Sequence, residues 1–202
     1  MDGPGEVSRS ELQATVEARR ELGAGYEPAL IDGFLGPSEK LQILQVPYES
    51  PDVGLLVTRL QSEYVTRYGG PDDTPLTAAE LRPPEGVFLV LRRAGAPLAM
   101  GGWRRHVQAR SGWVPGRRAA EIKRMYVLPE ARSLGLGRRV LAELERLAAA
   151  DGCDQMVLET GLAQPEAIAL YRSAGFHDIA SFGHYVESPQ SVHLGKPLTP
   201  AA

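Results

Sequence analysis

A short segment between a predicted strand and a predicted helix carries residues suited to binding phosphate. Arg132, Gly135 and Gly137 follow the spacing R-x-x-G-x-G directly before a long helical pattern. The first N–H groups of a helix have no partner within it and the helix dipole is positive at that end, so anions bind there. A glycine lets a phosphate approach the backbone, and an arginine adds positive charge. We therefore expect this turn to bind a phosphate-bearing cofactor; a glycine-containing helix start without a ligand is the alternative. The turn consists of Arg132, Ser133, Leu134, Gly135, Leu136, Gly137 and Arg138.

The turn lacks residues that two common nucleotide-binding motifs require, which limits the phosphate ligands that it could bind. A dinucleotide-binding turn needs the third glycine of G-x-G-x-x-G, and Val140 stands in that place. A P-loop needs Gly-Lys followed by Ser or Thr, and the chain has no such run. Both common nucleotide-binding turns are therefore disfavoured.

The remaining pattern resembles the acetyl-CoA pyrophosphate loop of the GNAT superfamily of N-acetyltransferases, Gln/Arg-x-x-Gly-x-Gly/Ala. A second segment, running from Gln164 to Phe176, resembles the family's next motif, Asn-x-x-Ala-x-x-Leu-Tyr-x-x-x-Gly-Phe. It departs from that motif at Gln164, where many members have Asn, and Gln164 would contact the pantetheine arm of CoA. The resemblance covers about residues 41–198 and is strongest over 121–176.

The resemblance also implies catalytic roles. Tyr171 matches the family's general acid, and a neutral phenol with a pKa of about 10 can protonate a departing CoA thiolate. Glu121, eleven residues before Arg132, matches the glutamate that removes the amine proton in several members. For Tyr171 the alternative is a packed core aromatic beside Ile168. For Glu121 the alternative is an ion pair with Lys123 or with nearby arginines.

In the family, the strand before the phosphate turn splays from its neighbour. Its backbone groups at Met125, Tyr126 and Val127 would then hold the pantetheine arm and polarise the thioester carbonyl. The alternative is ordinary pairing between the two strands.

The elements that position these residues follow from apolar periodicity and from glycine and proline breaks. Alternation over 120–128 assigns Glu121, Lys123, Met125 and Val127 to one face of a strand and Ile122, Arg124, Tyr126 and Leu128 to the other. Residues 103–118, rich in arginine and interrupted by Ser-Gly and Pro-Gly, are expected to form a loop or hairpin. Helices are predicted over 53–68, 135–150 and 165–174 with a short helical turn at 77–81, and strands over 41–46, 86–92, 98–104, 120–128, 155–160, 176–179 and 192–196.

Composition excludes several classes of protein. The net charge of -3 gives no global attraction to nucleic acid, and no run of 18 apolar residues predicts a membrane span. The four histidines show no metal-ligand spacing, so we expect no metal site. The single cysteine, Cys153, is expected to be a small buried hydrophobic residue rather than a nucleophile. The N-terminus lacks the basic and apolar regions of a signal peptide, so a cytoplasmic protein is expected.

Together these features predict an α/β (mixed α+β) fold of the GNAT type, with a mixed, mostly antiparallel seven-stranded sheet flanked by helices. Residues 1–36 are expected to be an extension, partly helical or mobile, and 37–202 the acetyltransferase domain. The expected activity is transfer of an acetyl group from acetyl-CoA to a primary amine, on a small molecule or peptide, by direct attack in a ternary complex. A non-catalytic acyl-CoA-binding sensor is the alternative, and a homodimer is left open.

Overall fold

The computed structural model describes residues 41–106 and 118–199. They form one seven-stranded sheet in the order β1-β2-β3-β4-β5-β7-β6. Every neighbouring pair is antiparallel except β4 and β5, which are parallel. The predicted mixed, mostly antiparallel seven-stranded sheet is thus confirmed. The strands are β1 (Gln42–Gln45), β2 (Gly86–Arg93), β3 (Ala96–His106), β4 (Ala119–Val127), β5 (Gln155–Gly161), β6 (His177–Asp178) and β7 (Ser191–Pro197).

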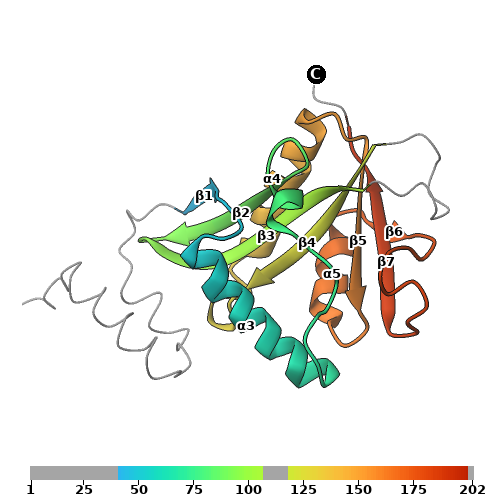
Figure 1. Ribbon diagram of the computed structural model, residues 1–202, viewed down its shortest axis with the longest axis horizontal. Coiled ribbons are helices and arrows are strands. Elements are labelled where there is room, and N and C mark those ends of the chain that lie inside the picture. The colour runs from blue at the N-terminus through green and yellow to red at the C-terminus, as the bar shows by residue number, and fades with distance from the viewer. Residues whose placement is uncertain (1–40, 107–117, 200–202) are drawn as a thin grey trace, which may run out of the picture.

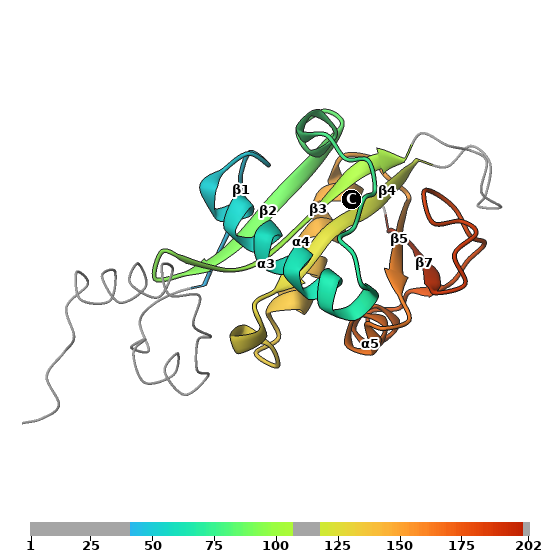
Figure 2. The ribbon, with the colours of Figure 1, turned by 60° about the horizontal axis from the view of Figure 1, so that its bottom comes forward.

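Among the described residues, three α-helices flank the sheet, with α3 and α4 on opposite faces (Figures 1 and 2). In α3 (Pro51–Tyr68), a proline occupies the first turn, and Val53, Leu56 and Leu60 bury one side. In α4 (Leu136–Ala150), the buried side is Leu136, Val140, Leu141, Leu144 and Ala148, as the apolar spacing predicts. The shorter α5 (Pro165–Ser173) follows β5. Two 3-10 turns, η1 (Ala78–Leu81) and η2 (Pro129–Ala131), complete the elements.

Strand β4 departs from the expected alternation at a β-bulge. Two of its residues, Arg124 and Met125, lie opposite Gly101 of β3, and Arg124 has a positive φ of 56°. Glu121 and Lys123 therefore lie on the α3 face, whereas Met125 turns to the other face, where its sulfur lies against the Cβ position of Gly101 beside Leu144 of α4. The prediction that these residues share one face is wrong because a bulge shifts a strand by one residue.

Two further differences from the sequence prediction concern β3 and β6. The strand β3 continues through Arg105 and His106, which were expected only in the loop or hairpin at 103–118, and Trp103 is buried in the core. The strand expected at 176–179 is reduced to the two residues of β6 at the sheet edge. The N-terminal extension (1–36) and the segment 107–117 lie outside the described residues.

Candidate active site

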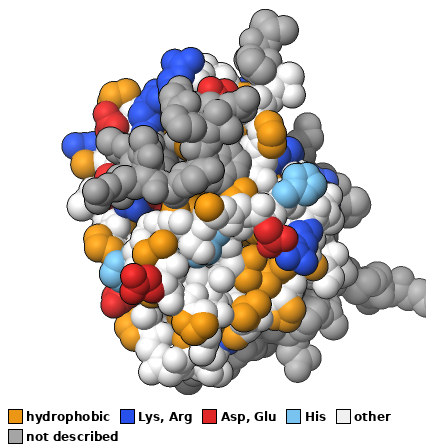
Figure 3. Space-filling model, turned by 90° about the vertical axis from the view of Figure 1, so that its right-hand side faces the viewer, with side chains coloured by type: hydrophobic (Ala, Val, Ile, Leu, Met, Phe, Trp, Pro, Cys, Tyr) orange, Lys and Arg blue, Asp and Glu red, His pale blue; other side chains and the backbone are white. Residues whose placement is uncertain are grey.

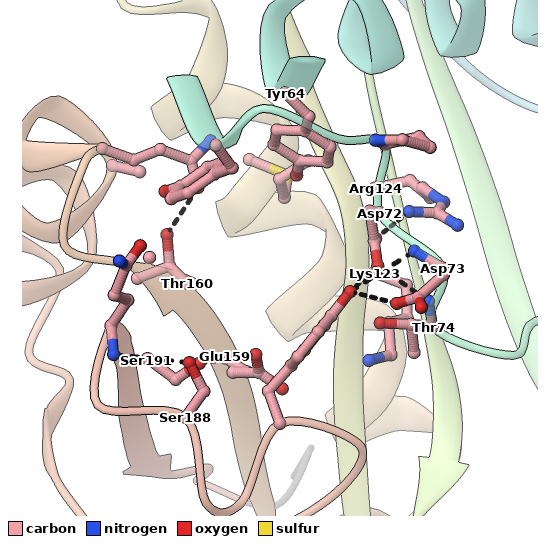
Figure 4. Close-up of a pocket in the computed structure, with 18 of the residues that line it drawn as sticks. Tyr64, Asp72, Asp73, Thr74, Lys123, Arg124, Glu159, Thr160, Ser188 and Ser191 are labelled. Carbon is pink, nitrogen blue, oxygen red and sulfur yellow. Dashed lines mark hydrogen bonds and ion pairs between the residues drawn. The ribbon is translucent and has the colours of Figure 1, made fainter. Parts of the chain in front are cut away.

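A pocket of about 360 Å³ opens on the α3 face where β4 and β5 separate. The two strands pair only from Ala119↔Gln155 to Glu121↔Val157, although both continue beyond that point. The divergence expected of this strand is therefore present. Figure 4 shows side chains from α3, β4, β5 and two loops converging on the pocket. Gly161, at the end of β5, admits Tyr68 of α3, because a Cβ there would lie 2.0 Å from the tyrosine hydroxyl.

Two loops distant in sequence meet at the pocket through Tyr185. Its hydroxyl donates to Asp73 Oδ1 at 2.6 Å and to Asp72 Oδ1 at 3.1 Å. The aspartates follow α3, and Tyr185 lies in the segment 179–190 between β6 and β7. Figure 3 views the molecule from the β6–β7 side, where side chains of different kinds are interspersed. The Tyr185 contact joins the first and last parts of the described fold across the pocket.

Glu159 of β5 projects into the pocket, and the sequence analysis did not identify it. Ser191 Oγ donates to Glu159 Oε1 at 3.2 Å. Burial raises the pKa of Glu159 to about 7; Lys123 and Ser191 partly offset this effect, while Asp72 and Glu121 add to it. A carboxyl group with a pKa near neutrality can accept and release a proton under physiological conditions, which is the property required of a general base.

Tyr171 and Gln164 of the second motif also line the pocket. Tyr171 is only 5% exposed and its ring packs edge-on against Phe176, with centroids 5.7 Å apart. Burial, and to a lesser extent Tyr64, raises the pKa of Tyr171, so its hydroxyl stays protonated. Gln164 caps the start of α5, and its Oε1 accepts from Thr160 Oγ1 at 3.1 Å. Both residues therefore face the space between β4 and β5.

Of the three predicted residues of β4, Val127 directs its backbone groups to this space. The Leu128 N–H bonds Leu98 of β3 at 2.9 Å, and backbone groups of a strand alternate between its two neighbours. Tyr126 therefore also faces β3, while the backbone groups of Val127 face the side from which β5 has diverged; Met125 lies in the bulge, where this alternation is interrupted. Tyr126 instead buries its side chain, with the Arg132 guanidinium 5.8 Å from its ring centroid.

Glu121 lies outside the pocket lining and is 1% exposed. Its carboxylate accepts from Lys123 Nζ at 2.6 Å and from Arg104 Nε at 2.8 Å. The ion pair with Lys123 that the sequence left open is thus present. Glu121 is therefore held by two cations and does not line the space in which an acceptor would bind. The geometry does not favour the role of base for Glu121.

A neutral replacement tests this structural interpretation. Glu121→Gln is expected to lower the free energy of unfolding by about 1.5–3 kcal/mol, because it weakens two charge-assisted hydrogen bonds in a buried site. Denaturant titration of the two proteins measures the difference. Glu143→Gln, which alters an exposed pair with Arg146, is the control and should change stability little. Equal stability of wild type and Glu121→Gln would contradict a structural role.

The predicted phosphate turn connects η2 to α4. Gly135 caps the helix with a φ of 74°, and a Cβ built there meets nothing within 4 Å. The Arg139 N–H bonds Gly135 O at 3.1 Å, so the N–H groups just before it lie at the open end of the helix. At Gly137 a Cβ would lie 3.3 Å from Leu170 of α5 and 3.5 Å from Val127 of β4. The turn therefore adjoins both the open side of β4 and α5, and its open cradle fits an anion.

The side chains of the turn are less available than its backbone. Arg132 donates to Glu63 Oε2 at 2.5 Å and to Val127 O at 3.2 Å, and Arg138 donates to Ser173 Oγ at 2.5 Å. Leu136 is buried in the core, whereas Leu134 is exposed. Ser133 has a positive φ of 64°, which shapes the loop before Gly135. A phosphate at this turn would meet backbone N–H groups first and would share Arg132 with Glu63.

Other reactive groups lie away from the pocket. Cys153 is buried, and burial raises the pKa of its thiol, which makes a nucleophilic thiolate less accessible. Within 41–106 and 118–199, no group of three or more His, Cys, Asp or Glu side chains could hold a metal ion.

In the same ranges no helix is long and apolar enough to cross a membrane.

Comparisons with known proteins agree with the fold and the motifs. The model of the acetyltransferase (GNAT) family matches residues 56–176. An IAA acetyltransferase from Azospirillum brasilense is 40% identical over 118 residues, which is 58% of this chain and 72% of that protein.

Solved structures of acyltransferases share the fold. A Klebsiella pneumoniae protein assigned as an acyl-CoA N-acyltransferase superposes with a TM-score of 0.64 at 28% identity, over 79% of this chain and 98% of that one. A chain of the NatC complex bound to Gag peptide and CoA has a TM-score of 0.57 at 16% identity, over 79% of this chain and 99% of that one. This chain belongs to the GNAT family and is an acetyl-CoA-dependent N-acetyltransferase.

Proposed function

We propose that the protein transfers the acetyl group of acetyl-CoA to a primary amine by direct attack in a ternary complex. The supporting observation is one pocket, at the divergence of β4 and β5, that is lined by a protonated tyrosine and a carboxyl group with a pKa near 7. A non-catalytic acyl-CoA sensor would need the phosphate turn but neither of these groups.

In this proposal the turn at 132–138 binds the pyrophosphate of CoA through the N-terminal N–H groups of α4. The pantetheine arm runs along Met125 and Val127 of β4, with Gln164 of α5 on its other side. A backbone N–H group of this stretch of β4 donates to the thioester oxygen as negative charge develops there. The thioester carbon then lies within reach of groups in the pocket.

Glu159 serves as the base in place of Glu121. It takes one proton from the bound ammonium, and the neutral nitrogen attacks the thioester carbon. As the C–S bond breaks, Tyr171 protonates the CoA thiolate and regains a proton from the acetylated nitrogen. The products are the amide, CoA as a thiol and one proton, which Glu159 passes to solvent. Deprotonating an ordinary alkylammonium at pH 7 costs roughly 4–5 kcal/mol, which is why a base is required.

Initial rates of CoA release, with acetyl-CoA and a primary amine varied together, test the proposal. Small aliphatic amines and peptide N-termini are both assayed. A ternary-complex mechanism gives intersecting double-reciprocal lines, whereas an acyl-enzyme route gives parallel lines. CoA release that does not depend on any amine would contradict the proposed function.

Tyr171→Phe tests the acid. The ring and its packing against Phe176 remain, but the donated proton is lost. We expect kcat to fall about 10- to 100-fold, which is modest because a thiolate with a conjugate-acid pKa near 8.5 departs fairly readily without an acid. Acetyl-CoA affinity, measured by calorimetry, is expected to stay unchanged. If kcat of Tyr171→Phe equalled that of the wild type under conditions where the chemical step limits the rate, Tyr171 would not be the acid and would serve only in packing.

A further inference from the structure

The cationic side chains that line the pocket are already paired with carboxylates. Lys123 Nζ lies 2.6 Å from Glu121 Oε1, and the Arg124 guanidinium is paired with Asp72. Asp72 also accepts from the Thr74 N–H at 2.9 Å and from the Tyr185 hydroxyl at 3.1 Å. A substrate anion would have to displace one of these carboxylates from its cation.

Two carboxylates of the lining, Glu159 and Asp73, have no arginine or lysine partner among the described residues. Glu159 accepts a hydrogen bond from Ser191 through Oε1 only. Asp73 accepts from Tyr185 at 2.6 Å and contacts His184 Nε2 at 3.2 Å, both through Oδ1. Pairing of the charges therefore leaves negative charge at two separate points of the pocket.

The two carboxylates have different protonation properties. The hydrogen bonds from Tyr185, and then from His184, lower the pKa of Asp73, so it stays ionised. Burial raises the pKa of Glu159 to about 7, so it exchanges a proton near neutrality. A pair of carboxyl groups with divergent pKa values commonly divides the work, one as acid or base and one as a fixed charge.

An independent feature points to a polar ligand in the same pocket. Tyr171 lines the pocket with 5% of its surface exposed, and its hydroxyl stays protonated. A hydroxyl of this kind can donate a hydrogen bond to a polar ligand in the pocket. The lining also carries Tyr64, Tyr68 and Tyr185, whose rings are suited to contact with an ammonium group.

We propose that the acceptor is a small aliphatic amine bearing a second positive charge, a diamine or polyamine, with its reacting amine at Glu159 and its distal ammonium at Asp73. This inference rests on the proposed function, because Glu159 receives the proton of the reacting amine. Asp73, which accepts a hydrogen bond from Tyr185, is then a specificity-determining residue, because it pairs with the distal ammonium group of the acceptor.

Acceptors of equal length that differ only in distal charge provide the test. Diaminobutane, aminobutanol and aminobutanoate each carry one reacting amine on a four-carbon chain, with a positive, neutral or negative group at the other end. The five-carbon series is run in parallel. CoA release gives kcat/KM for each compound at about pH 8, above the pKa of about 7 of Glu159. Asp73→Asn is compared with Asp178→Asn, which alters an exposed pair with Arg172 outside the pocket lining.

We expect kcat/KM to follow the order diamine, amino alcohol, amino acid, with about two- to fivefold between the first two, the effect of one ion pair at an exposed carboxylate. Asp73→Asn should lower the ratio of diamine to amino alcohol by a similar factor, about two- to fivefold, because the contribution of this ion pair is lost. Asp178→Asn should preserve the ratio.

Three outcomes would overturn the inference. The first is equal or better use of the alcohol or the carboxylate by the wild type, and the second is an unchanged ratio in Asp73→Asn. The third is no acetylation of any panel member while a peptide N-terminus is acetylated. All three leave the proposed function standing. Failure of every amine, peptides included, to increase CoA release would instead contradict the proposed function itself.

Discussion

Replacing Glu159 with glutamine is expected to lower kcat by about 10²–10⁴-fold, the range for loss of a general base. Glutamine keeps the size of the side chain and can still accept the hydrogen bond from Ser191, but it cannot take a proton. Acetyl-CoA affinity should not change, because Glu159 lies in the acceptor pocket and not at the phosphate turn. Steady-state rates with a competent amine, together with calorimetry on acetyl-CoA, separate the two effects.

The pH profile provides an internal check on this variant. Glu159, with its pKa raised to about 7, is protonated below that pH and cannot act as a base, so wild-type kcat should rise with pH and level off above about 7. Glu159→Gln should lack this rise. Glu143→Gln, on an exposed face of α4, should keep both the rate and the profile. If Glu159→Gln kept the wild-type kcat and the same rise of kcat with pH, a group other than Glu159 would have to be the base.

Introducing carboxylates into the phosphate turn is expected to abolish acetyl-CoA binding. In Gly135→Asp/Gly137→Asp the new side chains fill the cradle before α4 and repel the pyrophosphate. Loss of two charge-assisted hydrogen bonds, at about 1.5–3 kcal/mol each, corresponds to roughly 10²–10⁴-fold weaker binding. Calorimetry on the folded double variant measures the change.

The matched control for this variant is Gly135→Asn/Gly137→Asn, which adds nearly the same volume without charge. Both doubles carry the strain of a non-glycine residue at the positive φ of Gly135, and Asn and Asp tolerate it about equally. The Asn double should therefore lose less affinity than the Asp double. Wild-type affinity in a folded Asp double would show that the cofactor does not use this turn.

Much of the fold could be predicted because it follows local rules. The buried side of α4 recurs at helical spacing, and Gly135 and Asp151-Gly152 mark its ends in the sequence. The phosphate turn and Tyr171 could be identified for the same reason, since each lies in a short motif with fixed spacing. Their order along the chain resembles a known family closely enough to imply their roles.

The acceptor pocket could not be predicted, because it depends on contacts between distant segments. The bulge at Arg124 is invisible in a strand whose apolar and polar residues appear to alternate without interruption. Glu159 lies near the end of β5, whose sequence is that of an ordinary strand, and its raised pKa depends on burial by residues that the sequence does not place beside it. The family resemblance, in spacing and residue type, favoured Glu121, yet its partner Arg104 comes from the neighbouring strand β3.

The contact of Tyr185 with Asp72 and Asp73 has a consequence for how relatives diverge. The family match ends at residue 176, whereas Tyr185, Ser188, Gln190 and Ser191, which form one wall of the pocket, lie after it. Substitutions in this wall leave the cofactor motifs untouched, so selection can change the acceptor while the acetyl donor stays the same. Two members with matching motifs can therefore differ in substrate, and comparison of the segment between β6 and β7 is the more informative guide to a shared acceptor.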